Sequence, residues 1–202
     1  MAEIKEIIRQ TQNKFLNMFE FRGKNKVGND FRYFVASRAA KDEDLKAVSG
    51  VNHPDGVIMY ALYGEKKDRV VLIRQYRYPL GNFIYEFPAG LVEKGEDYRE
   101  CAVREMHEET GLIFSPVDAD NMFEAPRFTT AGLTDESCCM VYGYASGEPS
   151  RKYLEEGEEI QIILADRDEV RRILKEEQVA LMCAYQLMHF LADEEPFAFL
   201  NI

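Results

Sequence analysis

From Gly56 onward, short apolar runs alternate with polar turns, a pattern that predicts β-strands. The predicted strands are Val57–Tyr63, Arg69–Tyr76, Phe83–Phe87, Ile113–Phe114, Met122–Glu124, Ser137–Ala145 and Glu159–Leu164. Between them, Asp97–Thr110 has helical periodicity. Two more helices are predicted at Asp166–Lys175, where Asp166 is a suitable N-cap, and at Glu177–Leu191. This order of elements predicts a mixed α/β domain.

The first fifty residues have a different pattern. Six apolar side chains recur at roughly helical spacing over residues 3–19 and predict a helix, or a helix and a turn: Ile4, Ile7, Ile8, Phe15, Leu16 and Phe19. A turn-rich connector follows at Gly23–Asp30, and Phe31–Ser37 alternates as a strand does. We therefore expect residues 1–50 to form a helix–strand extension and residues 51–202 to form the main domain.

The helix predicted at Asp97–Thr110 combines an apolar side with a cluster of acids. The side predicted to face the core carries Tyr98, Cys101, Ala102, Val103 and Met106. Glu105 and Glu109 are four residues apart and point the same way, with Glu108 beside them. Three carboxylates on one face repel one another unless a positive charge lies between them, and Mg²⁺ takes oxygen ligands of this kind. A solvated acidic face is the alternative, but it does not explain the glycine loop before the helix.

The spacing of these residues carries a resemblance to a known family. The pattern G-x5-E-x7-R-E-U-x-E-E-x-G-U, where U is a bulky apolar residue, is met at every fixed position. These positions are Gly90, Glu96, Arg104, Glu105, Met106, Glu108, Glu109, Gly111 and Leu112. At residue frequencies of roughly 5–10%, such a match arises by chance on the order of once per billion windows. The segment resembles the Nudix box, and the resemblance covers roughly Gly56 to Leu191.

The Nudix resemblance implies an α/β/α sandwich around a mixed sheet and the hydrolysis of a pyrophosphate linkage by water. It also implies Mg²⁺, with Mn²⁺ as an alternative, because a metal neutralises the phosphate charge and lowers the pKa of bound water. Glu105, Glu109 and the backbone carbonyl of Ala89 would bind metal, and Glu109 would thereby serve catalysis. Glu108 would be a further ligand or would orient the water. Arg104 is expected to orient the acids, and His107 to have a surface or packing role.

Sequences flanking the box resemble the ADP-ribose and nucleotide-sugar pyrophosphatase branch. These are LIRQYRYP from Leu72 and YEFPAG from Tyr85. By that resemblance, Arg77 binds substrate phosphate and Glu86 lies near the site. Pro126 matches the spacing of a proline in the branch. Residues 130–136 resemble its S-P-G-x-[ST]-x-E segment, with alanine in place of the proline. This segment ends in two acids, Asp135 and Glu136, for which a structural role at the start of the next strand is the alternative.

An acidic loop precedes the strand predicted at Glu159–Leu164. It resembles the loop that supplies the catalytic glutamate in this branch. By that resemblance Glu156 would be the general base and Glu158 a metal ligand. The register stays open, because Glu155 can take the place of Glu156, and a run of acids is also typical of a solvated loop.

Composition narrows the choice of partners. The 202 residues carry a net charge of −11, which argues against binding to a nucleic acid backbone. No apolar run approaches the roughly 18 residues that span a bilayer, and the N-terminus does not resemble a signal peptide. Four cysteines without metal-ligand spacing indicate reduced packing residues: Cys101, Cys138, Cys139 and Cys183. We expect a cytoplasmic protein that binds neither nucleic acid nor membrane.

The leading functional hypothesis is metal-dependent cleavage of ADP-ribose, or a related nucleoside diphosphate sugar, into a nucleoside monophosphate and a sugar phosphate. Other Nudix substrates are the first alternative: nucleoside triphosphates, dinucleoside polyphosphates, NADH or coenzyme A. A module that senses a nucleotide sugar without cleaving it is the second alternative, and the intact acids of the box argue against it. The resemblance also implies a homodimer that exchanges N-terminal strands, with Phe31–Ser37 as the candidate strand.

Overall fold

The computed structural model describes residues 1–201 and contains two compact units. The first unit consists of Met1–Asp55 and Pro126–Cys138, and the second of Gly56–Ala125 with the chain from Cys139 onward. The domain boundary predicted after residue 50 stays a prediction.

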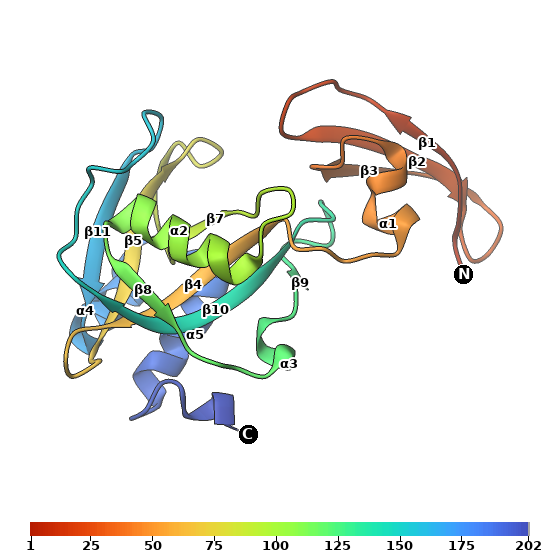
Figure 1. Ribbon diagram of the computed structural model, residues 1–202. Helices are drawn as coiled ribbons and strands as arrows, with labels where there is room; N and C mark the ends of the chain where they lie inside the picture. Colours follow the sequence, from red (N-terminus) through yellow and green to blue (C-terminus); the bar gives the residue numbers. More distant parts are fainter. Residues whose placement is uncertain (202) are drawn as a thin grey trace. The chain divides into compact units, whose positions relative to one another are not determined.

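An antiparallel sheet forms the N-terminal part of the first unit (Figure 1). Its strands lie in the order β1 (Glu3–Arg9), β2 (Asn17–Lys24) and β3 (Asp30–Ser37). The helix predicted over residues 3–19 is therefore wrong, whereas the strand predicted at Phe31–Ser37 is confirmed. β1 pairs with β2 at Ile7↔Phe21 and Arg9↔Phe19. The spacing of the isoleucines fits a helix, but β-branched side chains also favour strands, and pairing with β2 decides between the two.

The core of the first unit is small. It consists of Phe19 and Phe21 of β2, Val35 of β3 and Leu45, which joins the short helices η1 (Asp42–Asp44) and α1 (Lys46–Ser49). Glu20 is also buried, and hydrogen bonds from the guanidinium groups of Arg32 and Arg22 lower its pKa to about 2. Because these bonds satisfy the charge of Glu20, the unit tolerates a buried acid beside its apolar residues.

The second unit is built on a sheet whose main path is β11-β5-β4-β10-β8. These strands span Ile160–Ala165, Arg69–Arg77, Gly56–Tyr63, Ser137–Ser146 and Ile113–Pro116, respectively. Three shorter strands join the path: β6 (Asn82–Glu86) pairs with β5, β7 (Ala89–Leu91) pairs with β4, and β9 (Arg127–Phe128) pairs with the start of β10. The first residues of β10, Ser137 and Cys138, belong to the first unit.

Helices cover both faces of this sheet (Figure 1). On one face, α2 (Tyr98–Thr110) packs Met106 into a buried cluster with Val57 and Met59 of β4. In Figure 1, α2 crosses in front of the strands, while α4 (Arg167–Glu176) and α5 (Leu181–Ala192) lie behind them. On the face opposite α2, Tyr60 of β4 contacts the rings of Phe87 and Phe197. The predicted mixed α/β fold with a mixed sheet and helices is confirmed.

Capping residues in the sequence predicted most of the helix ends correctly. Asp97 caps α2 by accepting hydrogen bonds from the backbone N–H groups of Arg99 and Glu100, and Asp166 caps α4 in the same way. The strand predicted at Met122–Glu124 is wrong. That segment is the short helix α3 (Asn121–Glu124), because the side chain of Asp120 accepts from Met122 N and starts a helical turn.

Two further expectations need correction. Val103 was expected to face the core, but it is 40% exposed, because the buried arc of α2 runs through Cys101, Ala102 and Met106. The last helix begins at Leu181 rather than at Glu177. Residues 178–180 are extended, since Tyr85 N donates to Gln178 O at 2.8 Å and Ala180 N donates to Tyr85 O at 3.0 Å. Hydrogen bonding to strand β6 therefore holds residues 178–180 in an extended conformation, although the local sequence predicts a helix.

Within residues 1–201, no helix is long and apolar enough to cross a membrane. Cys101, Cys139 and Cys183 are buried free thiols, as expected for packing residues. A second 3-10 helix, η2 (Ala198–Asn201), ends the described chain.

Candidate active site

The glycine loop brings the backbone of β7 against the acidic side of α2. Ala89 N donates a hydrogen bond to Glu109 Oε2 at 3.0 Å. At the next residue, Gly90, an added Cβ would lie only 1.9 Å from Glu105 Cδ. Glu105 can keep this position only if residue 90 is glycine, because any side chain would occupy the space of its carboxylate. The loop and the helix together place two carboxylates beside one short stretch of backbone.

Arg104 holds three acids of the segment. Its Nε lies 2.8 Å from Glu96 Oε1, and its Nη1 lies 2.8 Å from Glu105 Oε1 and 2.9 Å from Glu108 Oε2. The hydrogen bond from Arg104 lowers the pKa of Glu96 to about 2. Arg104 therefore supplies positive charge among acids that would otherwise repel one another, and it orients Glu105 and Glu108.

Burial works against ionisation of the remaining acids. The side chain of Glu109 is buried, and this raises its pKa well above the ordinary value, although the Ala89 N–H opposes the shift. Burial also raises the pKa of Glu105. Glu158, from the loop before β11, contributes to the upward shift of both groups through its charge. The fold thus brings an acid from about fifty residues away into the electrostatic neighbourhood of α2.

Arg77 and Glu86 form an ion pair beside these acids. They lie on the paired strands β5 and β6, and Arg77 Nε is 2.7 Å from Glu86 Oε2. The charge of Arg77 opposes the raised pKa values of Glu109 and Glu158, so it reaches both the helix and the loop. Arg77 also lines the adjoining cavity, together with Glu158.

That cavity has a volume of about 430 Å³. It is lined by the end of β5 and the residues after it, Gln75–Pro79, and by the acidic loop, Glu156–Glu159. Tyr76 and Tyr78 form one wall, with their ring centroids 5.5 Å apart. Aromatic rings, a guanidinium group and carboxylates therefore line the same cavity.

The two candidate glutamates of the acidic loop lie differently. Glu156 is exposed in a turn and lines the cavity. Glu158 is half-buried, accepts a hydrogen bond from Glu155 N at 3.2 Å, and has its pKa raised first by burial and also by the charges of Glu155 and Glu108. Glu158 is thus the loop acid whose charge reaches α2. The roles assigned to Glu156 and Glu158 stay predictions.

The donor set fits a hard divalent cation. Glu105, Glu109 and Glu158 offer only oxygen acceptors, and all three have raised pKa values, which a bound cation would lower. Across residues 1–201, no three His, Cys, Asp or Glu side chains are arranged as a ready metal cluster. Arg104 Nη1 lies 2.8 Å from Glu105 Oε1, so one of the three acids is paired with a cation of the protein.

His107 has a partner that the sequence did not reveal. Its ring centroid lies 4.4 Å from that of Tyr153, which precedes the acidic loop. His107 is a variable position of the box, and Tyr153 lies in an irregular segment, so no periodicity connects them.

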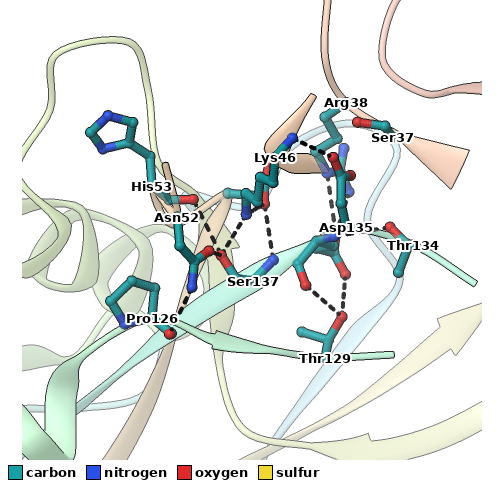
Figure 2. Close-up of polar contacts among 12 residues, drawn as sticks. Ser37, Arg38, Lys46, Asn52, His53, Pro126, Thr129, Thr134, Asp135 and Ser137 are labelled. Carbon is teal, nitrogen blue, oxygen red and sulfur yellow. Dashed lines mark hydrogen bonds and ion pairs between the residues drawn. The ribbon is translucent and has the colours of Figure 1, made fainter. Parts of the chain in front are cut away.

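The flanking residues after α3 have structural contacts within the first unit (Figure 2). The carbonyl of Pro126 accepts a hydrogen bond from Asn52 Nδ2 at 3.1 Å. Asp135 Oδ2 accepts from Lys46 N at 3.3 Å, and Glu136 Oε1 lies 3.2 Å from Arg38 Nη2. The structural alternative for these two acids therefore has direct contacts to support it.

A partly buried polar cluster lies in the same region. Ser137 Oγ donates to Asn52 Oδ1 at 2.7 Å (Figure 2). Lys46 Nζ lies 2.6 Å from Asp55 Oδ2. The backbone N–H of Ser137 also donates to Asp55 Oδ2 at 2.9 Å. The cluster joins segments that are more than eighty residues apart in sequence, and its polar groups satisfy one another.

A mixed α/β domain with a glycine loop, an acidic helix and an arginine beside them defines a site for an anionic, phosphate-bearing substrate. Residues 52–185 match the family model for the NUDIX domain. The chain belongs to the Nudix family.

Several relatives and one solved structure are similar to the chain. A methanol dehydrogenase activator of Bacillus methanolicus is 36% identical over 134 residues, which cover 64% of this chain and 67% of that protein. A putative nudix hydrolase of Caenorhabditis elegans is 36% identical over 129 residues, and the chain spans 54% of its length. An ADP-ribose pyrophosphatase of Bacillus subtilis is 29% identical over 133 residues, 64% of this chain and 67% of that one.

The crystal structure of an ADP compounds hydrolase matches with a TM-score of 0.61 at 16% identity. The match covers 87% of this chain and 83% of the other. At this identity the match supports the fold.

Proposed function

We propose that the protein hydrolyses the pyrophosphate bond of ADP-ribose, or of a related nucleoside diphosphate sugar, with Mg²⁺ or Mn²⁺ as cofactor. The products are a nucleoside monophosphate and a sugar phosphate. The observation that carries the proposal is twofold: the loop at Ala89 and Gly90 lies against Glu105 and Glu109 of α2, and Arg77 and Glu158 line one cavity of about 430 Å³. The similarity to the ADP-ribose pyrophosphatase of Bacillus subtilis supports it.

In this proposal, the acids hold the metal and the arginine holds the substrate. Glu105, Glu109, Glu158 and the carbonyl of Ala89 are the proposed ligands. A divalent cation bound there supplies Lewis-acid chemistry, because it neutralises the diphosphate and makes water more acidic. Arg77 donates to a phosphate oxygen, and its pairing with Glu86 at 2.7 Å fixes the direction of the guanidinium.

The attacking water needs a base and an orienting group. We assign the base to Glu156, which lines the cavity in an exposed turn. Glu108, which Arg104 holds at 2.9 Å, is assigned to orient the water. The buried Glu109 is assigned to the metal, since a cation would offset the cost of its charge in this position.

The cavity supports a sugar on the far side of the diphosphate. Carboxylates of the 156–159 loop accept hydrogen bonds from hydroxyl groups, and the rings of Tyr76 and Tyr78 offer faces to the C–H side of a sugar. A third phosphate in place of the sugar would be repelled by the acids of the loop. We therefore favour nucleoside diphosphate sugars over nucleoside triphosphates.

The N-terminal sheet supports a second proposal. Tyr33 and Phe34 of β3 are 45% and 49% exposed, which is high for aromatic residues on a strand. We propose that residues 1–50 are an extension through which the protein, residing in the cytoplasm, forms a homodimer. Multi-angle light scattering of the wild type and of Tyr33→Ser/Phe34→Ser tests it. A monomeric wild type would exclude the dimer.

The function is tested with Glu105→Gln and a substrate panel. ADP-ribose, ADP-glucose, GDP-mannose, NADH, a nucleoside triphosphate and diadenosine polyphosphates are supplied with Mg²⁺, and phosphate is measured after phosphatase coupling. We expect turnover of the nucleotide sugars, and a loss of about 100-fold or more in Glu105→Gln with an unchanged melting temperature. Glu100→Gln, on the exposed side of α2, is the matched control. An unaffected Glu105→Gln would reject the ligand assignment, and a wild type inactive on the whole panel would reject hydrolysis.

A further inference from the structure

The segment that leads into the acidic loop runs back along α2. At the C-terminal end of the helix, Ser150 N donates to Thr110 O at 2.8 Å. One helical turn earlier, the ring of Tyr153 lies 4.4 Å from that of His107. Further along, Glu158 is close enough to be influenced by the charge of Glu108. The segment from Ser150 to Tyr153 thus contacts the last turn of the helix, and the charge of Glu158 acts on an acid of the same turn.

The far end of this segment is held by the sheet. Glu159 O accepts a hydrogen bond from Tyr76 N at 3.2 Å, and Ile160 opposite Gln75 then begins the pairing of β11 with β5. Backbone hydrogen bonds therefore hold residues 150 and 159. The eight residues between them include both candidate glutamates, Glu156 and Glu158.

Electrostatics oppose the approach of this loop to the helix. The loop carries Glu155, Glu156, Glu158 and Glu159, and the charge of Glu158 acts on Glu105 and Glu109 of α2. Like charges repel, and the charge of Arg77 acts in the opposite direction on Glu158. The hydrogen bonds at residues 150 and 159 hold only the ends of the segment, so a contact that does not depend on charge would help the residues between them to keep their position against the helix.

We propose that His107 and Tyr153 provide this contact. They are a positioning pair that holds the acidic loop against the catalytic helix, and they thereby determine where Glu156 and Glu158 lie relative to the acids of α2. Both residues lie at the surface, with Tyr153 45% exposed, so their contact contributes little to the core and can position the loop. This inference rests on the proposed function, because it assigns the loop glutamates to catalysis. It makes His107, a variable box position, a residue that acts through the loop.

The experiment compares His107→Ala, Tyr153→Ala and the double variant with Tyr153→Phe, which keeps the ring. Exchange of the amide hydrogens of residues 151–158 is measured in each protein, together with kcat and KM for ADP-ribose. In the alanine variants we expect faster exchange in this segment and a kcat about three- to tenfold lower, with KM changed less than twofold. Tyr153→Phe should retain the wild-type values, because the ring contact is kept.

The double variant gives the sharpest result. If the two rings act through one contact, His107→Ala/Tyr153→Ala will lose no more activity than either single variant. The melting temperatures of the wild type, the two single alanine variants and the double variant will agree. Arg151→Ala, an exposed position of the same loop, is the matched control and should behave as wild type.

Unchanged exchange and unchanged kcat in Tyr153→Ala would overturn the proposal, as would independent, multiplicative losses in the double variant. Failure of the proposed function is distinguishable from these outcomes. It would appear as a wild type without nucleotide-sugar hydrolysis, while hydrogen exchange would still report whether the rings hold the loop.

Discussion

Replacing Gly90 by alanine should separate activity from stability. The added Cβ would lie 1.9 Å from Glu105 Cδ, 2.1 Å from its Oε1 and 2.2 Å from its Cγ. An ordinary contact begins near 3.4 Å, so the carboxylate would have to retreat by about 1.5 Å. A ligand held about 2.1 Å from Mg²⁺ cannot follow such a shift and stay bound. Misplacement by about 1 Å can lower a rate about 100-fold, so we expect kcat/KM to fall by about that factor, or about 2.7 kcal/mol.

Stability should change little in the same variant. The atoms in the way belong to a flexible side chain, and Gly90 lies in strand β7 with a backbone that alanine can adopt. The smaller conformational entropy of the unfolded chain contributes roughly 0.4–1 kcal/mol in favour of alanine. Displacing Glu105 from its partly buried ion pair with Arg104 costs about as much. The melting temperature should therefore stay within about 4 °C of the wild type.

Gly143→Ala is the matched comparison. Its Cβ would meet Ser115 O, a backbone atom, at 2.5 Å and the ring of Phe114 at 2.6 Å. Backbone cannot swing aside, so this variant should lose stability, measured by thermal unfolding, and keep the activity of its folded fraction. Full activity in Gly90→Ala, or a collapse of its melting temperature, would refute the reasoning about position 90.

Three further predictions concern the charges of the site. Arg104→Met should lower the free energy of unfolding at pH 7 by roughly 1–3 kcal/mol, because Glu96 loses its charged partner. The pKa of Glu96 is lowered to about 2, so the stabilisation by its ion pair is present above pH 4.5 and is lost as the pH falls toward 2. In urea unfolding, the difference in free energy of unfolding between wild type and variant should therefore be smaller at pH 3 than at pH 7. Glu109→Gln should stabilise the protein in EDTA at neutral pH and abolish turnover. The pKa of Glu109 is raised, so the folded state loses stability as Glu109 ionises, whereas glutamine stays neutral and can still accept a hydrogen bond from Ala89 N. A lower melting temperature of the variant in EDTA would contradict this. Arg77→Ala should reduce kcat/KM for ADP-ribose about 10- to 100-fold, and Arg77→Lys should recover only part of the loss because lysine cannot donate in a fork; equal activity of the alanine variant and the wild type would remove Arg77 from the site.

Local patterns in the sequence were sufficient where one element decides its own structure. The helix α2 begins after Asp97 and ends before Gly111, because the cap and the glycine act within one turn of the chain. The strands of the second unit follow from runs of apolar residues that are buried on both faces. The same kind of reasoning failed at the N-terminus, where the isoleucines fit either a helix or a strand.

The sequence by itself determined that a glycine loop precedes an acidic helix, that Arg104 lies among the acids, and that the chain carries the box of the Nudix family. These features depend on spacing within about twenty residues. Only the tertiary structure decided which partners arrive from elsewhere: Glu158 beside α2, Tyr153 on His107, and Glu86 against Arg77. The physical reason is that such contacts arise from strand pairing and loop closure between distant segments, which leave no periodicity in the chain.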